Sequence, residues 1–372
     1  MISNSELPSQ AVRIDSSLSL DLLADPDYAN HPAYGQAFPP ARGWTRLKAI
    51  GRLLPWLVFA IVKQALLGDR LPAVSNHGDG LEGGLLRRLR ALPKYIPLWL
   101  KEVAAGLRVS RSGDAGAADP DLSARLSADG IVSARFSRSE MARLRGMTSS
   151  YLSGLLAKRE FVSFTTFKGN QHVFTREEHC YVYDVVTELF AKHGLLRAAG
   201  AYLGREVELK RLLLQANDCR DQYLYNCFPD VGLGNSRTNY MHIDRGYGSL
   251  KCIVYLSEVG ERNGPFCYVL GSNRLNLGFS KALIRRAVDR AGLAGCDREA
   301  RQLFMALPPA LRKKSEFGSD IMDGSANSES LLEAEFRFTS ECGDVAVFDN
   351  LGIHRGALVE EGRRIALFAV LA

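Results

Sequence analysis

The sequence lacks several features that mark specialised classes of protein. Its seven cysteines are an odd number and include no CxxC pair, which argues against a disulfide framework and against a zinc cluster. The N-terminus has no basic stretch followed by an apolar core, so a secretory signal is not indicated. Internal repeats and low-complexity tracts are also absent. We therefore expect a soluble globular protein in a reducing, cytoplasmic compartment.

An apolar run of membrane-spanning length is missing as well. The apolar stretch at 53–62 is interrupted by Lys63 and Gln64, and it is shorter than the roughly 20 residues that cross a bilayer. It lies in a basic region, because residues 41–111 hold 13 Lys and Arg against 4 Asp and Glu, whereas the whole chain carries +6. We expect a helix that packs on the rest of the chain with a solvated basic rim, and no nucleic-acid partner. Peripheral contact with the inner face of a membrane through residues 44–107 stays open as an alternative.

Length and composition divide the chain into two parts. With 372 residues and 46% hydrophobic composition, the chain can bury one large core or two smaller ones. Residues 110–121 are rich in Gly, Ser, Ala and Asp and form the best candidate linker. We therefore predict a basic, partly helical N-terminal region at 1–120 and a second domain at 121–372. Helices are expected in parts of 44–68 and 82–107.

Helix signals and breaks organise the remaining segments. Pro55 is expected to mark a break or a first turn of its helix. A long helix is predicted through about 176–216, with one interruption near His193 and Gly194. Two further helices are predicted within an insertion, at 281–294 and 298–306.

The most informative motif is a His-x-Asp triplet. In an extended chain, residues two apart point to the same face, so His242 and Asp244 can hold one ion together. A third ligand is available in His354, which follows an apolar run at 345–348 that indicates a buried strand. Two imidazoles and one carboxylate on one face of an octahedron leave three positions open, which is the ligand set of non-heme iron(II) oxygenases. We predict that these three residues bind iron(II) and form the catalytic centre.

An arginine near the C-terminus complements this set. Arg364 follows His354 on the predicted closing strand, where its planar fork of donors can hold a carboxylate in two parallel hydrogen bonds. An oxo-acid co-substrate needs such a contact. Strand alternation places Arg363 and Arg364 on opposite faces, and because both faces are apolar, residue order alone leaves the choice between them open.

With these motifs, the sequence resembles the phytanoyl-CoA dioxygenase-like family of Fe(II)/2-oxoglutarate-dependent oxygenases. The similarity extends to a strand, turn and strand block and to an opening strand and helix, at residues 253–259, 263–266, 271–274 and 126–145. It spans roughly residues 122–372. The resemblance implies an α+β fold with a double-stranded β-helix core, a cupin-like jelly roll, flanked by helices. It also implies that Arg364 is the arginine that binds 2-oxoglutarate.

The resemblance further implies an oxidative reaction that uses Fe(II), 2-oxoglutarate and dioxygen. The expected outcome is hydroxylation of an unactivated C–H bond in a small-molecule or lipid-like substrate, with release of succinate and CO2. Asp244 favours this outcome, because iron halogenases of this kind lack the carboxylate. Lys251 and Tyr255 share one face of the strand after the His-x-Asp triplet, and in the family that face carries co-substrate contacts.

Two positions depart from the family pattern, and other functions stay open. Asn273 stands where His is usual, and Gly356 stands where several members carry a Ser that helps to bind 2-oxoglutarate. The second departure leaves the co-substrate with one donor fewer. One alternative function is a non-catalytic, metal-binding jelly-roll protein associated with a membrane. Another keeps the fold and performs desaturation, epoxidation or ring closure, which the sequence does not separate from hydroxylation.

Overall fold

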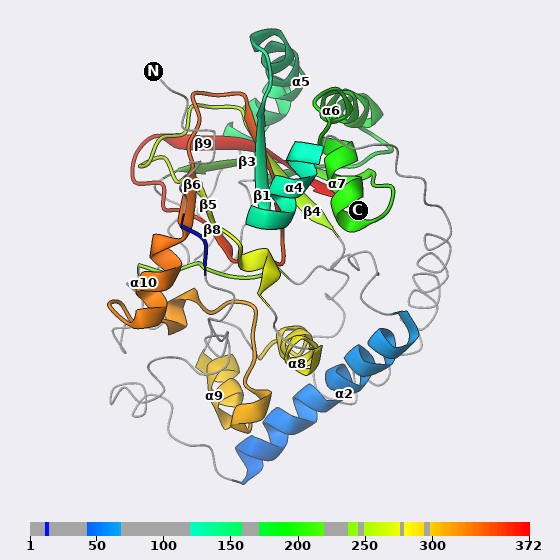
Figure 1. Cartoon of the computed structure of the whole chain (residues 1–372). Coiled ribbons are helices and arrows are strands. Elements are labelled where there is room, and N and C mark those ends of the chain that lie inside the picture. Colours follow the sequence, from blue (N-terminus) through cyan, green and yellow to red (C-terminus); the bar gives the residue numbers. More distant parts are fainter. Residues whose placement is uncertain are drawn as a thin grey trace.

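The computed structural model describes residues 12–14, 43–67, 120–157, 171–218, 237–244, 249–275, 279–293 and 298–372. Figure 1 shows these parts as ribbons coloured along the sequence. The predicted helix within 82–107 and nearly all of the predicted linker at 110–121 lie outside them. The domain boundary near residue 120 therefore stays a prediction.

In the described part of the chain, the strands form two sheets in which every pairing is antiparallel. The larger sheet has the order β1-β7-β4-β9-β3-β2, and the smaller has the order β6-β5-β8. The larger sheet contains β1 (Ile131–Arg135), β2 (Gln171–Phe174), β3 (Leu209–Asp218), β4 (Leu250–Tyr255), β7 (Asp344–Asp349) and β9 (Arg363–Leu371). The smaller contains β5 (Phe266–Val269), β6 (Glu335–Phe338) and β8 (His354–Gly356). The fold therefore mixes helices with antiparallel sheet.

An aromatic cluster joins the two sheets. It combines Tyr255 and Phe348 of the larger sheet with Phe266, Tyr268 and Phe338 of the smaller one, all of them buried. The rings of Phe266 and Phe348 have centroids 4.3 Å apart, and those of Tyr255 and Phe338 stack at 5.2 Å. Burial of such large side chains is the main term that holds the two sheets together.

A helical layer covers the opposite face of the larger sheet (Figure 1). Its members are α4 (Pro120–Asp129), α5 (Arg138–Ala157), α6 (Cys180–Lys192) and α7 (Leu195–Leu203). Strand alternation explains the division, because Cys252 and Val254 of β4 pack with these helices, whereas Ile253 and Tyr255 of the same strand face the aromatic cluster. The larger sheet is thus buried on both faces.

The predicted long helix through 176–216 is wrong in its C-terminal part. The break near His193 and Gly194 is confirmed, because it separates α6 from α7. α7 then ends at Gly204, whose φ is 65°, and β3 follows. The Leu, Lys, Arg and Gln residues of β3 suit a helix locally. Backbone pairing with β9 along the whole strand overrides that preference.

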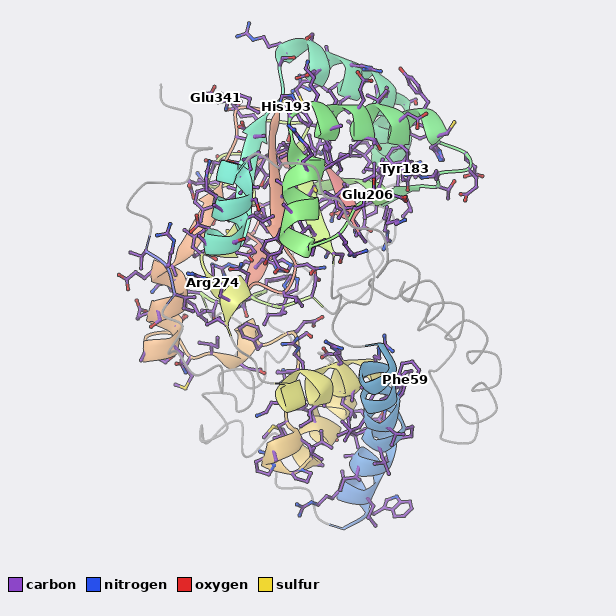
Figure 2. The ribbon with its side chains drawn as sticks, turned by 45° about the vertical axis from the view of Figure 1, so that its right-hand side comes forward. Phe59, Tyr183, His193, Glu206, Arg274 and Glu341 are labelled. Atoms are coloured by element: carbon purple, nitrogen blue, oxygen red, sulfur yellow. The ribbon has the colours of Figure 1, made fainter. Side chains whose placement is uncertain are left out.

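A second helical group lies at the other end of the molecule (Figure 1). It consists of α2 (Trp44–Leu67), α8 (Phe279–Arg290) and α9 (Arg298–Ala306), which share one hydrophobic core. The guanidinium of Arg290 lies 5.3 Å from the ring centroid of Phe59, the residue labelled on α2 in Figure 2. The prediction that the N-terminal helix packs on the rest of the chain is confirmed for α2, and the two predicted helices of the insertion are also confirmed.

Pro55 does not break its helix, contrary to the sequence-based expectation. It lies inside α2, which is continuous from Trp44 to Leu67. A proline in a helix interior removes one backbone hydrogen bond and crowds the carbonyl four residues before it. Buried Ala49 and Leu53 before it and half-buried Trp56 and Leu57 after it pack into the same core, so tertiary contacts hold both halves of the helix in place.

The shorter elements connect these layers. They are α10 (Ala326–Glu333) and the 3-10 helices η5 (Ser272–Arg274), η6 (Pro309–Leu311) and η7 (Gly318–Asp320). Among the described helices, none combines the length and apolar character that a bilayer span requires.

Two adjacent leucines of α2 test its packing. Leu53 is 1% exposed and Leu54 is 53% exposed. We expect Leu53→Ala to lower the free energy of unfolding by about 2–5 kcal/mol, because it leaves a cavity between α2, α8 and α9. Leu54→Ala should change it by less than about 0.5 kcal/mol. Denaturant unfolding followed by circular dichroism measures both, and equal effects would contradict this packing.

Candidate metal centre

The His-x-Asp triplet is held in an extended segment between two neighbours. His242 forms isolated antiparallel bridges with Glu316 and with His354. The N–H of His242 donates to the carbonyl of His354, and the N–H of His354 donates back to the carbonyl of His242, each at 3.0 Å. The N–H of Asp244 donates to the carbonyl of Asn350 at 2.9 Å. The predicted extended geometry is confirmed, although the triplet lies outside the named strands.

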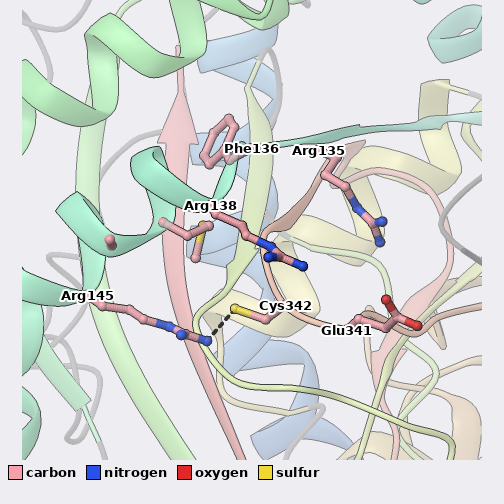
Figure 3. Close-up of a pocket in the computed structure, with 8 residues that line it drawn as sticks. Arg135, Phe136, Arg138, Arg145, Glu341 and Cys342 are labelled. Carbon is pink, nitrogen blue, oxygen red and sulfur yellow. Dashed lines mark hydrogen bonds between the residues drawn. The ribbon is translucent and has the colours of Figure 1, made fainter.

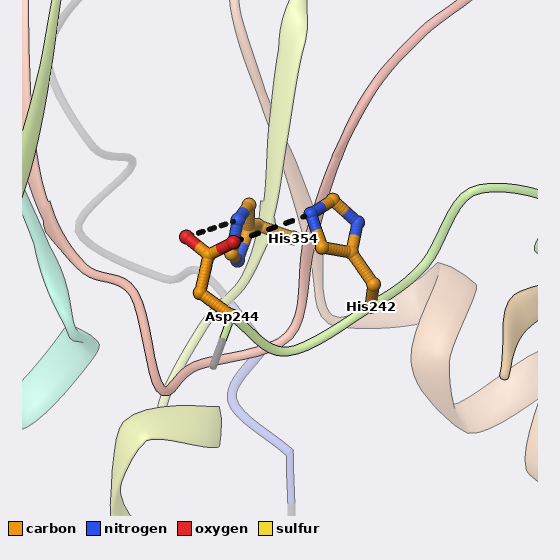
Figure 4. Close-up of side chains that lie close together, drawn as sticks. All are labelled: His242, Asp244 and His354. Carbon is orange, nitrogen blue, oxygen red and sulfur yellow. Dashed lines mark ion pairs between the residues drawn. The ribbon is translucent and has the colours of Figure 1, made fainter. Parts of the chain in front are cut away.

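The three predicted ligands converge at one point (Figure 4). Asp244 Oδ1 lies 3.9 Å from His242 Nε2, and Asp244 Oδ2 lies 3.5 Å from His354 Nε2. One ligand atom from each residue lies within 4.8 Å of the other two. These separations suit three ligands that share one ion.

Backbone carbonyls orient both imidazoles. His242 Nδ1 donates to the carbonyl of Tyr240 at 2.7 Å, and His354 Nδ1 donates to the carbonyl of Gly352 at 2.8 Å. In a neutral ring, a proton on Nδ1 leaves the Nε2 lone pair free. Both Nε2 atoms face Asp244, so each ring presents a lone pair to the same point. Outer hydrogen bonds of this kind commonly orient histidine ligands.

The candidate centre is closed to solvent behind His354 and more exposed at Asp244 and His242. The side chain of His354 is 5% exposed, whereas those of Asp244 and His242 are 19% and 30% exposed. The ring centroids of Phe348 and Phe266 lie 5.2 and 5.8 Å from that of His354. Aromatic side chains therefore exclude water behind His354, and approach is from the side of His242.

Lys251 lies directly beside the carboxylate. Its Nζ forms an ion pair with Asp244 Oδ2. Burial works against ionisation of Asp244, but Lys251 and His354 outweigh it and lower the pKa of this carboxyl. Desolvation by the surrounding protein, together with repulsion from His354, lowers the pKa of His242 to about 4. At neutral pH, Asp244 is therefore ionised and His242 is neutral, which is the state that binds a metal ion.

The sequence interpretation missed the residues that brace the distal ligand. Arg355 is buried and pairs with Glu335, with Nε 2.6 Å from Oε1 and Nη2 2.7 Å from Oε2. It also donates to the carbonyls of Asn239, at 3.0 Å, and Arg237. It thereby ties β8 to the segment that leads into the triplet. The signal in the sequence was the position of Arg355 directly after His354. An arginine next to a buried ligand is itself expected to be buried, and a buried arginine requires a partner.

Arg364 faces the smaller sheet, whereas Arg363 is exposed. Arg364 Nη2 donates to Asn217 Oδ1 at 3.1 Å, and Nη1 donates to the carbonyl of Gly264. Its Nε is buried and has no hydrogen-bond partner among the described residues. A Cβ placed on Gly356 would lie 3.1 Å from Nη1 of Arg364. This glycine therefore leaves room beside the guanidinium.

Tyr255 lies in the same layer as Arg364, but its hydroxyl is already engaged. The hydroxyl donates to the carbonyl of Phe338 at 3.0 Å and accepts from the N–H of Phe266 at 2.8 Å. Burial raises the pKa of Tyr255, although the nearby Arg364 opposes this. The structure thus places the ring close to Arg364, and the predicted co-substrate contacts of Lys251 and Tyr255 stay predictions.

Comparison with known proteins gives weak likenesses. No family model and no curated protein matches the chain. EctD from S. alaskensis, in its apoform, is 15% identical, with a TM-score of 0.40 over 71% of this chain and 80% of that one. AviO1 from Streptomyces viridochromogenes Tue57 is 14% identical, with a TM-score of 0.38 over 70% of this chain and 96% of that one.

A third solved structure is SnoK, a non-heme alpha ketoglutarate dependent carbocyclase from nogalamycin biosynthesis. It is 12% identical, with a TM-score of 0.39 over 70% of this chain and 85% of that one. EctD has also been solved with bound Fe, and with 2-oxoglutarate and 5-hydroxyectoine. Likeness at this level establishes neither a common fold nor a common activity. The geometry of His242, Asp244 and His354 therefore carries the functional argument.

The ion pair at the centre yields a test of metal affinity. Lys251→Met removes a positive charge next to the ligand carboxylate, so we expect the protein to bind cobalt(II) about tenfold more tightly. Lys210→Met is the matched control, because Lys210 pairs with Glu208 on the surface. Anaerobic calorimetric titration measures both affinities. Unchanged or weaker binding by the Lys251 variant would show that the ammonium does not compete with the metal ion.

Proposed function

We propose that this chain is an Fe(II)- and 2-oxoglutarate-dependent dioxygenase. The observation that carries the proposal is the convergence of His242, Asp244 and His354, with both Nε2 lone pairs directed at the carboxylate by carbonyl contacts on Nδ1. This donor set is that of the non-heme iron oxygenases, in which two imidazoles and one carboxylate leave open positions. The carboxylate of Asp244 is ionised and is held by the ammonium of Lys251, a cation whose place a metal ion would take.

The proposed fold is a double-stranded β-helix of the cupin-like, jelly-roll kind. Two antiparallel sheets that share an aromatic core support this proposal. The distal histidine comes from the smaller sheet, and the proposed anchor Arg364 comes from the larger one. In such a sandwich, side chains from the inner faces of both sheets meet in one space between them.

Arg364 is the proposed anchor for the far carboxylate of 2-oxoglutarate. Gly356 leaves room beside the guanidinium, and this glycine lies two positions after His354 on β8. At ~3.3 Å per strand residue, Gly356 lies about 7 Å along β8 from His354. Arg364, which lies beside Gly356, is therefore at a similar distance from this candidate ligand. That separation suits a five-carbon diacid with one end at each point. The unsatisfied Nε of Arg364 supplies a donor for the incoming carboxylate.

The chain's other residues position and shield the reactants. Phe266 and Phe348 pack against His354, which keeps water from the side of the centre behind this ligand. The ion pair between Lys251 and Asp244 must break when a metal ion binds the carboxylate. The ammonium of Lys251 can then bind a carboxylate of the co-substrate or substrate. The ring of Tyr255 shapes the wall next to Arg364. Bound iron supplies oxygen activation and cleavage of the C–H bond, and the protein orients the reactants.

Hydroxylation of an unactivated C–H bond in a small-molecule or lipid-like substrate is the proposed outcome, with succinate and CO2 as co-products. The presence of Asp244 supports it over halogenation, because the carboxylate occupies the place that a halide would need. Desaturation and ring closure use the same ligands and remain alternative outcomes. A non-catalytic metal-binding role is the rival from another class, and turnover experiments separate it from catalysis.

Peripheral membrane contact, with a cytoplasmic location at the inner face, is a further proposal for the N-terminal region. Of residues 44–107, the structure describes 44–67. The outward side of α2 carries Trp44, Leu47, Leu54 and Val58, which are 79%, 63%, 53% and 52% exposed. Exposed apolar groups in a basic region favour an anionic bilayer surface. Co-sedimentation with anionic vesicles at low and high salt tests this proposal.

The metal ligands give the first test of catalysis. His242→Ala, Asp244→Ala and His354→Ala should each abolish succinate release from 2-oxoglutarate while leaving the circular dichroism spectrum unchanged, because the ligands surround an open site. His179→Ala is the control, since His179 lies at the start of α6. Assays use protein loaded anaerobically with Fe(II) and then exposed to oxygen with metabolite extracts. Tighter binding of zinc than of iron, with no succinate from any extract, would favour the non-catalytic alternative.

Adjacent arginines give the second test. Arg364→Ala should raise the KM for 2-oxoglutarate at least about tenfold and leave the affinity for iron nearly unchanged, because it removes a charge-assisted carboxylate contact. Arg363→Ala should have little effect, since Arg363 is exposed. Steady-state kinetics with varied 2-oxoglutarate distinguish the two variants. A larger effect of the Arg363 variant would assign the anchor to the opposite face of β9.

A further inference from the structure

A second hollow lies apart from the metal centre. It has a volume of about 480 Å³, and Arg135, Phe136, Arg138, Arg145, Glu341 and Cys342 line it (Figure 3). It lies at the end of β1 and β7 where Arg135 pairs with Asp344. Asn350, which contacts the metal-binding triplet, follows the other end of β7. At ~3.4 Å per residue, the two ends of this strand are about 17 Å apart, so the hollow is separate from the metal centre.

Three guanidinium groups surround the hollow, and their partners differ. Arg135 is occupied by buried Asp344, with contacts of 2.7 and 2.9 Å. Arg145 donates to the carbonyl of Leu256 at 3.0 Å and has no acidic partner in the described part of the chain. Arg138 makes no hydrogen bond or ion pair with any described residue. Positive charge therefore remains at Arg138 and Arg145.

The acidic groups that face the hollow do not cancel this charge. Asp344 is committed to Arg135, and Glu341 acts on the same arginine, whose pKa it helps to raise. Figure 3 shows Arg138 pointing into the space between Arg135 and Cys342. The inner wall is apolar, because Phe136 and Met141 are 3% and 5% exposed. A ligand that suits this space has an anionic head and an apolar body.

We propose that this hollow binds a small organic anion, an aliphatic or aromatic carboxylate. Its head lies between Arg138 and Arg145, and its apolar body packs on Phe136 and Met141. Guanidinium groups hold carboxylates through charge-assisted, paired hydrogen bonds. The apolar wall adds affinity in proportion to the area that the ligand buries.

Cys342 lines this site, so the reactivity of its thiol can report whether the site is occupied. It does not act as a nucleophile there. Its thiol lies 2.6 Å from Nη2 of Arg145, and its backbone has a φ of 98°, which turns the loop there. Burial raises the pKa of this thiol more than Arg145 lowers it. The thiol therefore stays protonated at neutral pH, which disfavours covalent chemistry. A ligand on Arg145 would cover it.

Protection of this thiol measures occupancy directly. Full-length protein is titrated with octanoate, with octanol as the uncharged match, and alkylation of each cysteine is followed at peptide level by mass spectrometry. At ten times its apparent Kd, octanoate should slow alkylation of Cys342 about tenfold. Exposed Cys180 should react at an unchanged rate and is the internal control. Equal protection by octanol, or none by octanoate, would overturn the proposal.

Substitutions of two arginines on α5 then test whether the carboxylate binds in this hollow. Arg138→Gln should raise the apparent Kd for octanoate about tenfold, and Arg138→Lys should restore most of the affinity. Folding should be unaffected, since the side chain of Arg138 has no hydrogen bond or ion pair to lose within the described residues. Arg143→Gln is the matched control, because Arg143 pairs with Glu188 outside the hollow. Equal effects at Arg138 and Arg143 would also overturn the proposal, since they would indicate general charge attraction.

Discussion

The reciprocal backbone pair between His242 and His354 is the contact on which the rest of the centre depends. Two hydrogen bonds of 3.0 Å lock the peptide groups of two candidate ligands that are far apart in the sequence. Because Asp244 follows two residues later in an extended segment, its carboxylate falls on the same side as the imidazole of His242. The convergence of three side chains is thus a consequence of backbone pairing, and the carbonyls of Tyr240 and Gly352 then set the rings.

The electrostatics of the centre follow from that geometry. Burial disfavours the ionised form of Asp244, and the ammonium of Lys251 beside it offsets that cost. The lowered pKa values of Asp244 and His242 keep the set ready for a divalent ion. An ammonium and a metal ion would compete for this carboxylate, and we propose that Lys251 is then released to bind an anion.

Particular elements show where sequence patterns succeed and where they fail. The buried strand at 345–348 and the helical insertion were predictable, since their apolar periodicity agrees with their surroundings. β3 was not, because its residues favour a helix and its pairing partner β9 lies at the far end of the chain. The break expected at Pro55 was also wrong, because packing on α8 and α9 keeps α2 continuous through it. In both cases tertiary contacts outweigh local preference.

The sequence by itself determined which chemical groups this protein has to offer, namely two imidazoles, one carboxylate and an arginine in an order that indicates a metal centre. Only the tertiary structure decided their neighbours. It turned Arg364 inward and left Arg363 exposed, it committed the hydroxyl of Tyr255 to backbone groups, and it gathered guanidinium groups around a second hollow. These outcomes depend on which distant strands share hydrogen bonds, and local residue patterns do not encode that choice.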